Sequence, residues 1–155
     1  MHRCRVRGRV AFFVSLLASS AFAVSDGPDI LFLNSYHPGL YWSEQVQEGV
    51  RQNLGPHEQF VVEHLDSKHF EGGGGDSLFA AEFRFKYAAH SPKLIVSSDD
   101  YALRFLLHWR DSLFPAVPVV FCGVNNYEPS LLADRKGYTG LSQLNQMAQT
   151  IELWA

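Results

Sequence analysis

Short apolar segments alternate with amphipathic segments along most of this chain. Residues 30–33 (ILFL) form a continuous apolar run, as is typical of a strand that is buried on both faces. Similar patterns predict further strands over residues 60–65, 93–97, 118–122 and 138–141. Helical spacing of apolar residues predicts helices over residues 43–54, 78–89, 100–113 and 145–154. Residues 70–76 contain four consecutive glycines and are expected to form a loose loop.

This alternation predicts an α/β fold with a doubly wound, mainly parallel sheet and right-handed crossovers. In such sheets a ligand binds beyond the carboxyl ends of the strands. The rule selects the loops that follow the predicted strands, which are rich in Ser, Asn, Asp, His and aromatic residues: residues 34–42, 66–69, 97–100 and 123–127.

The first 23 residues have the order of a secretory signal peptide. Four arginines within residues 3–9 precede a short apolar segment, residues 10–18, and Ala21-Phe22-Ala23 has the small-x-small pattern of a cleavage site. The apolar segment is shorter than the roughly 20 residues that span a bilayer, although an uncleaved membrane anchor is the alternative. We expect cleavage after Ala23 and a periplasmic or otherwise extracytoplasmic location for the rest.

Composition and charge fit an acidic folded domain. Apolar residues make up 46% of the chain and charged residues 19%, a mixture that argues against disorder. No cluster of Lys and Arg follows Arg9, and phosphate neutralisation needs such clusters, so no nucleic-acid partner is expected. After Ala23 the only cysteine is Cys122, which excludes an intrachain disulfide in the mature chain.

Motifs for cofactor or metal binding are missing from the sequence. The glycine run at residues 72–75 lacks the Lys-Ser/Thr of a phosphate loop, and no G-x-G-x-x-G follows the first strand. His57, His64 and His69 are loosely spaced, without the Cys or Glu that would complete a zinc pattern. We predict no cofactor, no metal site and an inert core thiol at Cys122.

An aromatic loop is the most unusual feature of the sequence. Tyr36, His37, Tyr41 and Trp42 place four rings within seven residues. These rings could stack on a planar ligand or bind an amine. Alternatively, two or three of them cover the first strand.

Asp99 and Asp100 form a second candidate at the end of a predicted strand. The favoured interpretation is that Asp99 caps a helix that begins at Asp100. The alternative is a carboxylate pair that holds Mg²⁺. Capping is compatible with a ligand at the same helix end. The candidate ligand-binding residues at the strand ends are Ser35, Tyr36, His37, Trp42, Asp66, Ser98, Asp99 and Asn125.

Ordered motifs follow each strand from about residue 29 to the end of the chain. They are LNSYHPG at 33–39 with Trp42-Ser43, LDSK at 65–68, Lys86-Tyr87, LIVSSDDYALRFL at 94–106, LFP at 113–115, PVVFCGVN at 118–125 and YTGL at 138–141. Together they resemble the ABC transporter substrate-binding-like family, which has a type I periplasmic-binding-protein fold. Such domains are often the extracytoplasmic sensor part of bacterial histidine kinases and diguanylate cyclases.

The resemblance implies a two-lobed domain in which residues 24–155 are the first lobe and the second lobe is missing. The function it implies is binding of a small organic ligand as the sensor part of a signal-transduction protein, with no enzymatic activity in this chain. The implied partners are the second lobe and a membrane-anchored kinase or cyclase module. One alternative is a free solute-binding protein that docks on an ABC permease. Another is a metal-assisted hydrolase that uses Asp66, Asp99 and Asp100.

Overall fold

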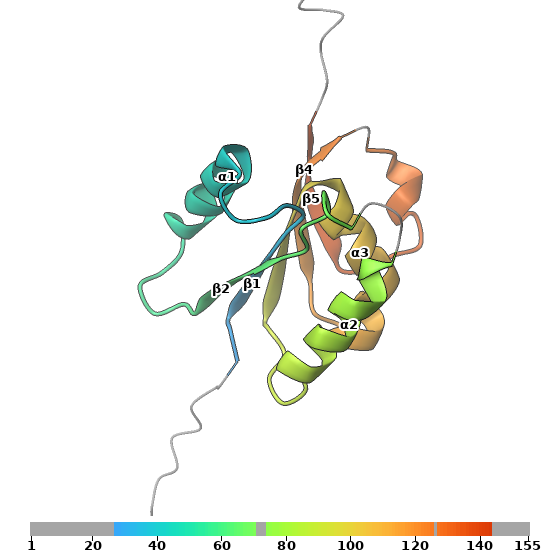
Figure 1. Cartoon of the computed structure of the whole chain (residues 1–155), viewed down its shortest axis with the longest axis horizontal. Helices are drawn as coiled ribbons and strands as arrows, with labels where there is room; N and C mark the ends of the chain where they lie inside the picture. The colour runs from blue at the N-terminus through green and yellow to red at the C-terminus, as the bar shows by residue number, and fades with distance from the viewer. Residues whose placement is uncertain (1–26, 71–73, 126, 144–155) are drawn as a thin grey trace, which may run out of the picture.

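A computed structural model describes residues 27–70, 74–125 and 127–143. Its five strands form one sheet in the order β2-β1-β3-β4-β5, and every neighbouring pair is parallel (Figure 1). The strands are β1 (Ile30–Asn34), β2 (Phe60–His64), β3 (Leu94–Ser98), β4 (Val119–Asn125) and β5 (Tyr138–Gln143). The helices are α1 (Tyr41–Arg51), α2 (Gly75–Lys86), α3 (Asp99–Leu113) and the short 3₁₀ helix η1 (Pro129–Leu132). This architecture confirms the predicted doubly wound α/β fold.

The helices cover both faces of the sheet. Helix α1 lies on one face, and α2 and α3 lie on the other (Figure 1). On the α1 side, Ile30 and Phe32 of β1 pack against apolar side chains that include Val46. Leu31 and Leu33 belong to the larger cluster on the α2 and α3 side. Strand β1 is therefore apolar at successive positions because both of its faces are buried.

Several boundaries differ from the sequence-based expectation by one to three residues. Helix α1 begins at Tyr41 rather than Ser43, and the buried Ser43 hydroxyl donates to the Leu40 carbonyl at 3.0 Å inside the first turn. Ser43 therefore does not cap the helix. Helix α2 begins at Gly75, earlier than predicted. Gly75 packs closely against Phe70, because a Cβ on Gly75 would lie 2.9 Å from the Phe70 Cβ.

Strand β4 continues to Asn125 instead of ending at Cys122. Gly123 has a φ of +69°, a backbone conformation that glycine adopts without strain. The register between β4 and β5 shifts between Phe121 and Val124, so Gly123 lies in an irregularity of the strand. Strand β4 continues past this irregularity to Asn125. The expected signal peptide at residues 1–23 and the expected helix at 145–154 lie outside the described residues.

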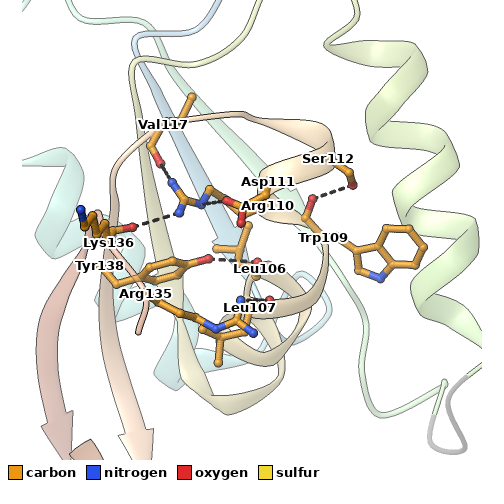
Figure 2. A network of polar contacts seen from close by, with 10 residues as sticks. All are labelled: Leu106, Leu107, Trp109, Arg110, Asp111, Ser112, Val117, Arg135, Lys136 and Tyr138. Carbon is orange, nitrogen blue, oxygen red and sulfur yellow. Dashed lines mark hydrogen bonds and ion pairs between the residues drawn. The ribbon is translucent and has the colours of Figure 1, made fainter. Parts of the chain in front are cut away.

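A buried arginine ties the end of α3 to the loops before β4 and β5 (Figure 2). Arg110 donates through Nη1 to the Val117 carbonyl at 3.1 Å and through Nη2 to the Lys136 carbonyl at 3.0 Å. Its guanidinium carbon lies 4.9 Å from the centroid of the Tyr138 ring, whose hydroxyl donates to the Leu106 carbonyl. These contacts hold the edge strand β5 against α3.

None of the described helices is long and apolar enough to cross a membrane.

Candidate functional site

The order of the strands marks where a ligand would bind. The chain leaves β1 toward α1 on one face of the sheet and leaves β3 toward α3 on the other (Figure 1). In doubly wound sheets a ligand binds beyond the carboxyl ends of strands that diverge in this way. A pocket of about 720 Å³ lies at this edge. Segments that follow four strands line it: Tyr36, Ser67, Lys68, Phe70, Asp99, Asp100, Tyr101, Leu103, Arg104, Val124, Asn125, Tyr127 and Leu131.

Ser35 and Ser98 are buried beneath the pocket and do not line it. The Ser35 hydroxyl donates to the Ser98 carbonyl at 2.6 Å and accepts the Ala102 backbone N–H at 2.8 Å. Ser35 therefore satisfies a backbone donor in the first turn of α3 from a position 67 residues earlier in the chain. The structure gives both serines a role in joining the end of β1 to the start of α3.

Asp99 reaches the pocket through an unusual backbone conformation. Its φ is +73°, a left-handed value that Asp adopts more readily than most residues. The carboxylate accepts the Asp100 N–H at 2.8 Å. Burial raises the pKa of Asp99, and the Asp100 N–H and the nearby Tyr36 hydroxyl oppose the rise. The residue is mostly enclosed by protein.

The start of α3 differs by one residue from the predicted capping arrangement. The helix begins at Asp99 itself, and the preceding residue, Ser98, makes no side-chain capping bond. Asp99 does satisfy one N–H of the first turn, that of Asp100. The buried N–H of Ala102 is satisfied instead by Ser35.

Asp100 joins α3 to the end of β4. Its carboxylate accepts the Asn125 side-chain amide at 2.9 Å and the Asn125 backbone N–H at 3.2 Å. Asn125 therefore reaches the pocket as predicted, with its amide nitrogen bonded to Asp100.

The aromatic loop is divided by the start of α1. Tyr36 lines the pocket, and its backbone N–H is held by the Asn34 side chain at 3.0 Å. Trp42 lies on the first turn of α1, is half exposed, and neither lines the pocket nor belongs to a core cluster. The ring of His37 lies 6.4 Å from that of His69, outside the pocket lining. Of the predicted aromatic site, only Tyr36 enters the pocket.

Asp66 supports the pocket loop after β2 and does not line the pocket. It has a φ of +43°, and its Oδ2 lies 2.7 Å from Nδ1 of His69. Ser67 and Lys68, which follow it directly, line the pocket, as does Phe70. The metal-assisted hydrolase interpretation needs Asp66 beside Asp99 and Asp100, and the fold does not bring these three together at the pocket. No group of three or more His, Cys, Asp or Glu side chains within the described ranges is arranged to hold a metal ion.

Several pocket residues were not selected from the sequence. Tyr101 and Arg104 belong to the first turns of α3, and Tyr127 follows β4, with its ring stacked 5.3 Å from that of Phe121. Arg104 lies four residues after Asp100, so the two residues share one face of the helix. That spacing, combined with the rule that ligands bind beyond strand ends, could have identified Arg104 as a pocket residue from the sequence.

Cys122 lies beside the site as a half-buried thiol. Its Sγ lies 3.6 Å from the Ser97 carbonyl oxygen. Burial raises the pKa of the thiol, which disfavours the reactive thiolate. This agrees with an inert structural cysteine.

Comparisons with known proteins identify no relative of this chain. The chain matches no family model, no curated protein and no solved structure. What it binds is therefore inferred from the chemistry of the pocket.

Proposed function

We propose that this chain is the ligand-binding lobe of an extracytoplasmic sensor in a signal-transduction protein of the histidine kinase or diguanylate cyclase type. The observation that carries the proposal is the pocket where the chain leaves β1 and β3 toward opposite faces of the sheet, the place where doubly wound folds bind small molecules. Its volume of about 720 Å³ suits a small organic ligand.

The pocket is built for binding because its supports are fixed before a ligand arrives. Ser35 holds the end of β1 to α3, and Asp100 holds the end of β4 to α3. The loops that carry Tyr36 and Asn125 are therefore joined to one rigid element. Such a preorganised site loses less conformational entropy when a ligand binds.

Exposed apolar side chains at the rim of the pocket support the proposal of a hinged second lobe. Phe70 and Leu131 both line the pocket, yet they expose 38% and 40% of their surface. Exposed apolar side chains around a polar pocket are typical of a surface that another protein surface covers. In the proposed sensor, a second lobe closes over these residues when the ligand binds, and closure biases a membrane-anchored kinase or cyclase module.

The proposal is tested by screening a small-molecule library for compounds that raise the melting temperature of the purified chain. The affinity of each hit is then measured by calorimetry on the wild type, Tyr36→Ala and Tyr41→Ala. Tyr36 lines the pocket, whereas Tyr41 is exposed on α1 outside it. We expect Tyr36→Ala to weaken binding by about tenfold or more, the loss typical of a buried aromatic contact, and Tyr41→Ala to bind normally. Absence of any hit, or equal affinity in all three proteins, would contradict the proposal.

A further inference from the structure

Two cationic side chains line the pocket from different elements. Lys68 lies in the loop after β2, and Arg104 lies in the second turn of α3. Both residues are exposed, so a ligand in the pocket reaches them without displacing the core. Segments far apart in sequence thus present two positive charges to one cavity.

The acidic side chains of the same pocket already have donors. Asp100 accepts two hydrogen bonds from Asn125, and Asp99 accepts the Asp100 N–H. An amine ligand would have to compete with these internal donors for either carboxylate.

Among the described residues, the two cations have no ionic partner. Within the described part of the chain, no carboxylate forms an ion pair with Lys68 or Arg104. The Lys68 ammonium lies 5.6 Å from the centroid of the Tyr36 ring, a cation–π contact that leaves its N–H donors available. Both cations are exposed and keep N–H donors available, whereas Asp99 is buried and Asp100 is partly buried and bonded to Asn125. The groups most accessible to an occupant of the pocket are therefore the two cations.

We propose that the pocket binds a small organic anion and that Lys68 and Arg104 determine this specificity by contacting its carboxylate or phosphate group. This inference rests on the proposed function, because it assigns a ligand class to the same pocket. The guanidinium of Arg104 suits a bidentate contact with such a group, and Lys68 supplies a point charge.

The test uses two sets of probes that differ in charge and share a carbon skeleton. The first set is benzoate, benzamide and benzylamine, and the second is succinate, succinamide and putrescine. Calorimetry measures each probe against the wild type, Lys68→Gln and Arg104→Gln, which keep much of each side-chain stem. Lys136→Gln and Arg84→Gln are matched controls, since neither residue lines the pocket. Thermal unfolding establishes that every variant is folded.

We expect the anion of at least one set to bind at least tenfold more tightly than its amide and its amine. Lys68→Gln and Arg104→Gln should each weaken that binding by about tenfold, because each removes a charge-assisted hydrogen bond, and added salt should weaken it further. The two controls should bind as the wild type does.

Three results would overturn the anion assignment while the pocket remained a binding site. The first is an amide or amine that binds as tightly as its anion. The second is anion affinity that is unchanged in both Lys68→Gln and Arg104→Gln. The third is a chain that binds only neutral or cationic library compounds through Tyr36. A chain that binds neither the probes nor any library compound overturns the proposed function as well.

Discussion

Replacing Ser35 by Ala separates a structural role from a ligand-binding role. The Ser35 hydroxyl makes two buried hydrogen bonds, to the Ser98 carbonyl and from the Ala102 N–H. In the variant, the Ser98 carbonyl still accepts the Ser35 backbone N–H at 3.2 Å. The N–H of Ala102 loses this partner, and Ala102 is fully buried.

The expected cost follows from that one orphaned donor. A buried donor left unpaired destabilises a protein by about 1–3 kcal/mol, and we expect Ser35→Ala to lower the free energy of unfolding by that amount. A loss of this size is a large share of the roughly 5–15 kcal/mol that stabilise a typical domain.

Urea denaturation of the wild type and the variant measures this difference in the free energy of unfolding. The comparison requires that the unfolding free energy of both proteins fall with urea concentration at the same slope. Ser112→Ala is the matched control, because the Ser112 hydroxyl bonds the Trp109 carbonyl at an exposed position. We expect its stability to change by less than about 0.5 kcal/mol. If Ser35→Ala were as stable as this control and had lost ligand binding, Ser35 would contact the ligand and the structural assignment would be wrong.

Three further changes test other parts of the fold, each followed by urea denaturation. Burial raises the pKa of Asp99 above its ordinary value of 3.8. The contribution of Asp99 to stability therefore falls as pH rises from about 4 through its folded pKa, and the wild type should lose stability relative to Asp99→Asn over this range. Parallel pH profiles of the two proteins would contradict this. A Cβ at Gly140 would lie 2.1 Å from the Phe121 carbonyl oxygen, so Gly140→Ala should lower the free energy of unfolding by about 1–3 kcal/mol. Gly49 lies in open space on α1, so Gly49→Ala should instead stabilise the protein by about 0.5–1 kcal/mol. Equal effects of the two substitutions would refute the packing argument. Arg110→Lys removes the planar group that bonds two carbonyls and should cost about 1–3 kcal/mol; an unchanged midpoint would show that these bonds contribute little.

The fold class follows from periodicity that is visible in the sequence. Residues 30–33 are apolar at every position because both faces of β1 are buried, against α1 on one side and α2 and α3 on the other. The same local patterns located the other four described strands and the three α-helices, although their ends moved by a few residues, and did not predict the short 3₁₀ helix η1. Ends move because a cap or a bulge depends on single contacts, such as Gly75 against Phe70 or the irregularity at Gly123.

The rule for strand ends selected loops that meet at the pocket but did not separate the residues that line it from those that support it. Of the selected residues, Tyr36, Asp99 and Asn125 line the pocket. Ser35 and Ser98, from the same loops, are buried beneath it. Adjacent residues in a loop point in different directions, and the contact that orients them comes from elsewhere in the chain.

Only the tertiary structure decided which distant residues share the cavity. Lys68 and Arg104 converge because β2 and β3 are both neighbours of β1, an arrangement that depends on strand order. Trp42 was excluded because α1 begins at Tyr41 and places that ring on an exposed helix face. Periodicity records which side of an element is buried, since burial repeats along the element. Membership of a pocket depends on the order in which the elements pack, and that order is set by contacts between residues far apart in the chain.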